Sequence, residues 1–140
     1  MNPHTDSILY VTDVDRSRLG TLLGRDGFSA WGDRRSLAEL AETLENCASV
    51  DARFAPKTLV TMNTAVSLVD IQTGEPRTVT LVYPQDVDLF PDGVSVLEPL
   101  GAALLGCHVG DVVQSAEQPQ CRLRIAEVVY QPEREKAFHL

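Results

Sequence analysis

The stretch that most constrains the fold is residues 99–111, which read Pro-Leu-Gly-Ala-Ala-Leu-Leu-Gly-Cys-His-Val-Gly-Asp. Proline suits the first turn of a helix, because its missing N–H would have no partner there, and Gly106 suits a left-handed helix end. Only one or two turns fit between them, with leucine and alanine on the apolar face. We therefore expect a short helix packed against a sheet and followed by a turn into a new strand.

Segments with strand patterns lie on both sides of this helix. Alternating apolar residues and turn signals predict five strands, in residues 60–71, 78–83, 94–97, 111–115 and 121–130. A turn with glycine at Gly74 separates the first two. Residues 58–140 are therefore expected to form one sheet domain that starts near Leu59.

The N-terminal part shows helical rather than strand patterns. Residues 13–23 predict one helix, which Gly24 ends, and Ser36 with Glu39 forms a capping box for a second helix reaching Ala48. We expect the two helices to form a short antiparallel hairpin and, with a linker at residues 52–58, a first domain of residues 1–57. The run at residues 7–11 fits either a strand or an extended segment. The predicted fold class is thus α+β.

Several of these segments together resemble a known family. Residues 60–70, 73–75, 81–84, 94–96, 99–106, 109–111 and 129–132 follow the order of the C-terminal domain of the Gre transcript-cleavage factors, the GreA/GreB family. The resemblance covers about half of the chain and implies an FKBP-like domain, an antiparallel sheet with one short helix. The opening at residues 60–63, the strand end at residues 81–84 and the small N-terminal part look most like the branch called regulator of nucleoside diphosphate kinase.

The resemblance implies binding to RNA polymerase at the rim of its secondary channel, in competition with longer coiled-coil factors. The contact it implies lies beside the small helix, at Tyr83, Pro84, Leu97, Glu98 and Pro99. Gre factors typically read Asp-Ser-Pro before this helix, whereas this chain reads Leu-Glu-Pro. A more apolar contact or a different loop geometry is therefore expected.

Two of these residues have alternative interpretations. Leu97 either faces the partner or, because the side chains of residues 94–97 alternate, lies hidden beneath the helix. Glu98 could instead form an ion pair with an arginine of the polymerase, which salt would weaken.

Two other functions compete with polymerase binding. A transcript-cleavage factor would use Asp26 or Asp33 at the hairpin tip beside the catalytic metal, but these two residues are not adjacent as the acidic pair of the cleavage factors is. The two predicted N-terminal helices would be only about 16–20 Å long, which is short for a helical hairpin that must traverse a channel. An FKBP-like prolyl isomerase or chaperone would need an aromatic-lined pocket, and the sheet domain has few aromatic residues. We therefore expect no catalytic residues and no enzyme activity.

Composition excludes further classes. The net charge is −8, and residues 58–140 hold 5 basic against 11 acidic residues, so direct nucleic-acid binding is not expected. The sequence has no run of about 18 apolar residues and no signal-peptide pattern, which predicts a cytoplasmic protein without membrane contact. Three dispersed cysteines, Cys47, Cys107 and Cys121, predict buried thiols rather than a metal site. No cofactor is expected, and the protein is expected to be a monomer.

Overall fold

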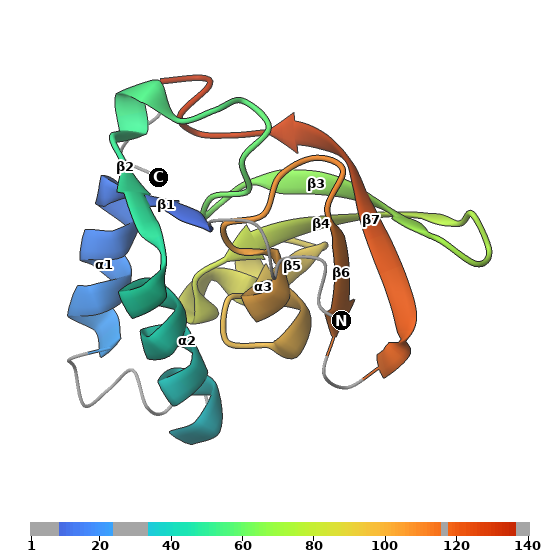
Figure 1. Ribbon diagram of the computed structural model, residues 1–140, viewed down its shortest axis with the longest axis horizontal. Coiled ribbons are helices and arrows are strands. Elements are labelled where there is room, and N and C mark those ends of the chain that lie inside the picture. The colour runs from blue at the N-terminus through green and yellow to red at the C-terminus, as the bar shows by residue number, and fades with distance from the viewer. Residues whose placement is uncertain (1–8, 24–33, 116–117, 137–140) are drawn as a thin grey trace.

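The computed structural model describes residues 9–23, 34–115 and 118–136, and its largest element is a five-stranded sheet (Figure 1). The strands are β3 (Ala65–Asp70), β4 (Pro76–Val82), β5 (Gly93–Ser95), β6 (Val112–Ser115) and β7 (Gln118–Tyr130), in the order β5-β4-β3-β7-β6. The central strand β3 pairs antiparallel with β4 and β7. Its Val66 and Leu68 point to one face and are fully buried. The expected mixture of helix and sheet is confirmed.

The sheet is mixed, which corrects the expectation of a purely antiparallel sheet. β5 runs parallel to β4, with Leu81 opposite Val94. The reason lies in the connection, since a 3-10 helix, η3 (Pro84–Leu89), follows β4 and returns the chain to the level of Thr80, where β5 begins. A tight hairpin would have made the pair antiparallel. η3 therefore stands at the β5 edge of the sheet.

The short helix of residues 99–111 is present as α3 (Pro99–Leu104), as the sequence predicts. Pro99 occupies its first turn, and Gly106 follows the helix with φ +85°. Leu104 is fully buried against the sheet. At Gly101 an added Cβ would lie 2.0 Å from the carbonyl oxygen of Ser95, so the helix approaches the end of β5 backbone to backbone.

The N-terminal part contains α1 (Asp13–Leu23) and α2 (Arg34–Asn46), which pack on each other and run in opposite directions (Figure 1). α1 has the predicted bounds. α2 starts at Arg34, so Ser36 lies inside the helix rather than at the cap position that the sequence predicted.

Two short strands at the base of the helices complete this part. β1 (Tyr10–Thr12) precedes α1 and β2 (Ala48–Val50) follows α2, and they pair in parallel. The sequence left open whether residues 7–11 form a strand or an extended segment. Residues 10 and 11 lie in a strand. Ala48, predicted as helical, belongs to β2. Beyond β2 the expected linker holds a 3-10 turn, η2 (Ala52–Phe54).

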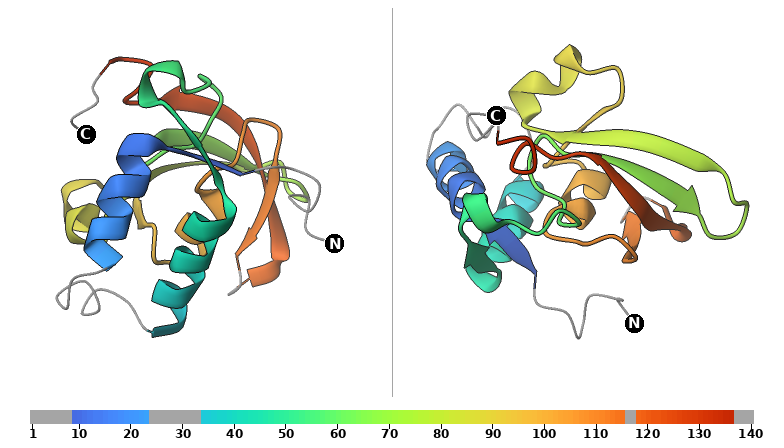
Figure 2. Two further views of the ribbon diagram at one scale, coloured as in Figure 1. Left: turned by 60° about the vertical axis from the view of Figure 1, so that its left-hand side comes forward. Right: turned by 90° about the horizontal axis from the view of Figure 1, so that it is seen from above.

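One hydrophobic core joins the two parts of the chain. Leu19 of α1, Leu40 of α2 and Leu104 of α3 belong to the same cluster of buried side chains. The three helices lie on one face of the sheet (Figure 2, right). The domain boundary near residue 57 stays a prediction, and the shared core leads us to expect that residues 58–140 alone are less stable than the whole chain. No helix in the described segments is long and apolar enough to cross a membrane.

Candidate docking groove

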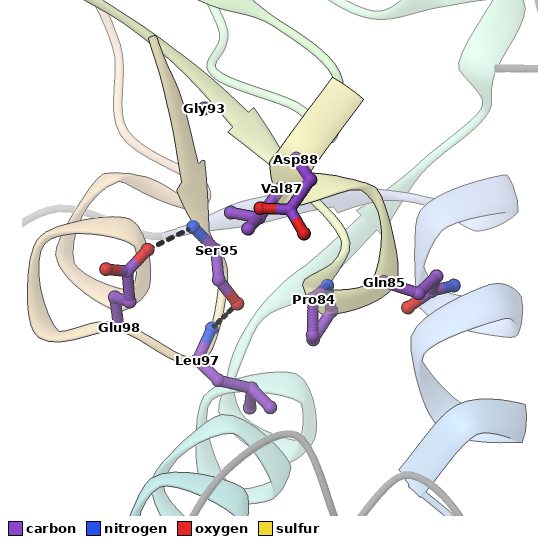
Figure 3. A pocket seen from close by; sticks show the side chains of 8 residues that line it. All are labelled: Pro84, Gln85, Val87, Asp88, Gly93, Ser95, Leu97 and Glu98. Carbon is purple, nitrogen blue, oxygen red and sulfur yellow. Dashed lines mark hydrogen bonds between the residues drawn. The ribbon is translucent and has the colours of Figure 1, made fainter. Parts of the chain in front are cut away.

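A groove of about 420 Å³ opens between η3 and the β5 end of the sheet (Figure 3). Residues of η3, of β5 and of the loop before α3 line it, namely Pro84, Gln85, Val87, Asp88, Gly93, Ser95, Leu97 and Glu98. An added Cβ on Gly93 would meet the Val87 carbonyl oxygen at 3.0 Å, so η3 is held close to the strand. The lining is partly apolar, and its two charged residues, Asp88 and Glu98, are acidic.

The loop before α3 is fixed by its own hydrogen bonds. The Ser95 N–H donates to Glu98 Oε2 at 2.6 Å, and the Leu97 N–H donates to Ser95 Oγ at 3.1 Å (Figure 3). The Glu98 N–H donates to the Ser95 carbonyl oxygen at 3.0 Å. Glu98 is thus bound within the loop and presents its carboxylate at the wall of the groove. Such a preordered loop loses little entropy when it meets a partner.

The structure brings together three of the five residues singled out in the sequence. Pro84, Leu97 and Glu98 line the groove, whereas Tyr83 and Pro99 do not belong to its lining. Glu98 is exposed and Pro99 is half-buried at the start of α3.

Leu97 and Tyr83 are largely hidden in the protein. Leu97 is 6% exposed, belongs to the hydrophobic core and points toward α2 (Figure 3). This burial corrects the interpretation that its side chain faces outward and agrees with the alternative. Tyr83 is also 6% exposed, and burial, with the charge of Asp15, raises the pKa of its hydroxyl. Asp26 and Asp33 lie outside the described residues.

Sequence reasoning missed the exposed apolar pair that ends η3. Leu89 is 73% exposed and Phe90 is 37% exposed, and the Phe90 carbonyl oxygen accepts the N–H of Gly93 in the groove. A leucine and a phenylalanine inside an acidic loop were the available signal. Exposed apolar side chains beside a groove are typical of a surface that binds another protein.

The cysteines and the potential metal ligands of the described residues do not form a cluster. In residues 9–23, 34–115 and 118–136, no three histidine, cysteine or acidic side chains are placed to hold a metal ion. Cys47 and Cys107 are buried as expected, and burial raises the pKa of both thiols. Cys121 is only half-buried, with its Sγ 3.6 Å from Asp70 Oδ2.

The role of Glu98 in the loop can be measured through stability. Glu98→Ala removes the acceptor of the buried Ser95 N–H, so we expect the free energy of unfolding to fall by about 1–2 kcal/mol. Glu98→Gln keeps an acceptor oxygen and should lose less. Urea denaturation of both variants checks the expectation, and equal losses would contradict it.

Comparison with known proteins shows the family to which the chain belongs. Residues 55–130 match the family model for the C-terminal part of the transcription elongation factors GreA/GreB. The chain therefore belongs to the GreA/GreB family. The matched segment contains the whole groove.

Among individual relatives, the regulator of nucleoside diphosphate kinase of Escherichia coli (strain K12) is 32% identical over 89% of this chain and 91% of its own length. Transcription elongation factor GreA of Mesomycoplasma hyopneumoniae (strain 7448) is 32% identical over 63% of this chain and 55% of its own. A solved structure of a GreA/GreB elongation factor from Nitrosomonas europaea aligns with a TM-score of 0.73, at 33% identity, over 89% of this chain and 100% of that one.

Proposed function

We propose that this protein is a transcription regulator that binds RNA polymerase through the groove between η3 and the loop before α3. The observation that carries the proposal is the preordered groove with the exposed pair Leu89 and Phe90 beside it, within the segment that matches the GreA/GreB family. The N-terminal helices and the FKBP-like sheet part act together as one docking module, and the protein binds as a monomer.

The finer mechanism that we propose is competition without catalysis. Docking takes place at the rim of the secondary channel, where Gre-type factors bind, and the protein cleaves no transcript itself. The 11 residues of α1 and 13 residues of α2 support this proposal, because such helices rise only about 16–20 Å. A factor of this size would occupy the docking site without a long probe.

The chemistry of the groove indicates what its partner should present. Asp88 and Glu98 are its charged lining residues, and the whole chain carries a net charge of −8. Leu89 and Phe90 add apolar area at the edge. We expect a partner surface that combines apolar side chains with arginine or lysine, so binding should weaken moderately as salt rises.

The test is direct binding to purified RNA polymerase. Replacing Leu89 and Phe90 together by serine should weaken binding by about ten- to thirtyfold, as expected for apolar anchors at an interface. Both residues are exposed, so stability should change little. Ile71→Ser is the matched control, because Ile71 is 51% exposed at the turn after β3 and does not line the groove.

Purified RNA polymerase also distinguishes the proposed function from its alternatives. Polymerase binding without shortening of the transcript in a stalled complex supports the proposal. Transcript cleavage that depends on Asp26 or Asp33 would replace it with a cleavage-factor function. No binding to the polymerase, or equal binding of the groove variant and the wild type, would overturn the docking site.

A further inference from the structure

Asp15 is a buried carboxyl group at the seam between the helical and sheet parts. It lies in the first turn of α1, where Thr12 Oγ1 caps the helix by accepting the Asp15 N–H at 3.1 Å. The side chain is 1% exposed, and its Oδ2 accepts the N–H of Met62 at 2.9 Å. This bond links two segments that are 47 residues apart in the chain.

The other oxygen of this carboxyl lacks a donor. Among the described residues, Asp15 Oδ1 has no hydrogen-bond partner although it is buried. A buried acceptor without a donor is costly when the group is ionised. A proton on Oδ1 removes the charge and turns the oxygen into a donor, while Oδ2 still accepts the Met62 N–H.

The titratable groups around Asp15 come from three elements. Glu133 approaches from the segment after β7, where its Oε1 accepts the Thr61 hydroxyl at 2.7 Å. Tyr83 approaches from the end of β4, and Arg18 from the next turn of α1. The segment at residues 61–64 contributes the Met62 N–H and the neutral hydroxyls of Thr61 and Thr64, which are 2.7 Å apart.

These surroundings favour the neutral form of the carboxyl. Burial raises the pKa of Asp15 from 3.8 to about 7, and the negative charge of Glu133 adds to the shift. The Met62 N–H, the Thr12 hydroxyl and Arg18 lower the pKa but only partly offset the burial.

We propose that the protonated carboxyl of Asp15 holds helix α1 against the segment at residues 61–64. We call this contact the Asp15 latch. The protonated carboxyl holds the helix in place without a buried charge. Loss of the proton leaves a charge that faces Glu133 and weakens the seating of α1 on the sheet part. The helical part would then open more often than the sheet as pH rises toward about 7.

The direction of the pH effect follows from proton linkage. The pKa is about 3.8 in the unfolded chain and about 7 in the folded one, so the folded chain binds more protons between these values. The stability contribution is fully present below about pH 4 and is lost as pH rises to about 7. A single such group makes the unfolding equilibrium constant rise on the order of fiftyfold between pH 5 and pH 7.

The experiment compares the full-length wild type with Asp15→Asn. Urea denaturation from pH 5 to pH 8 should show the roughly fiftyfold rise between pH 5 and pH 7 for the wild type relative to Asp15→Asn, whose side chain resembles the protonated acid and cannot ionise. Amide hydrogen exchange, expressed as protection factors, should show that α1 and Met62 lose protection with rising pH before β3 does. Identical pH profiles for the two proteins would overturn the latch.

A second variant keeps the test decisive if Asp15→Asn does not fold. Glu133→Gln removes the neighbouring negative charge, so the Asp15 transition should move to lower pH. A carboxyl titration by ¹³C NMR locates the transition directly in both the wild type and this variant. A midpoint near pH 4 for Asp15 in the wild type, or an unchanged midpoint in Glu133→Gln, would overturn the proposal.

Discussion

Replacing Leu97 by alanine is expected to lower the free energy of unfolding by about 2–5 kcal/mol, the range for a leucine in a packed core. The side chain is 6% exposed and belongs to the hydrophobic cluster shared by the helices and the sheet, so its loss leaves a cavity there. Denaturation midpoints at constant m-value measure the effect.

The matched control for this variant is Leu89→Ala, because Leu89 is 73% exposed beside the same groove. Its stability should change by less than about 0.5 kcal/mol. Polymerase binding by Leu97→Ala should be measured where the variant is fully folded, and it should then be close to wild type. An unchanged midpoint together with weakened binding would instead place the Leu97 side chain in the interface.

Replacing Gly101 by alanine is expected to cost more than about 3 kcal/mol, above the usual range for overpacking. The new Cβ would lie 2.0 Å from the Ser95 carbonyl oxygen and 2.8 Å from the Ser95 carbonyl carbon, and both are backbone atoms that cannot rotate away. α3 would have to move off the end of β5. Since the loop before α3 forms part of the groove, polymerase binding should fall as well.

Gly20 provides the control for this substitution. It lies in α1, is exposed, and an added Cβ there would meet nothing within 4 Å. Gly20→Ala should therefore stabilise the protein by about 0.5–1 kcal/mol through helix propensity. If Gly101→Ala were as stable as the wild type, the close approach of α3 to β5 would be wrong.

Local sequence signals predicted those parts of the fold that depend on nearby residues. The proline and glycine around α3 and the cap at the start of α1 are short-range features, and both helices lie where expected. The pairing of β1 with β2 was missed because each strand has three residues, too few for a pattern. The parallel direction of β5 depends on the path of η3, which the sequence pattern does not encode.

The candidate site was predicted in outline but not in detail. Sequence analysis placed the proposed contact beside α3, where the groove lies, but it left the burial of Leu97 open and did not predict that Tyr83 is buried. Burial of these two side chains depends on the hydrophobic cluster that joins the helices to the sheet, and its members are far apart in the sequence. Asp15 was also missed, although it lies four residues before the buried Leu19 and therefore on the same face of α1.

The pairing of β1 with β2 holds α1 and α2 together at one end, so the two helices could be lengthened at the other end. The two strands join the start of α1 to the end of α2, and the Ala48 N–H also donates to the Leu9 carbonyl oxygen at 2.9 Å. Inserting one turn into each helix beyond this base would lengthen the pair by about 5.4 Å without altering the sheet part. Longer helices on this base would therefore extend further from the sheet part, while the docking groove would stay the same.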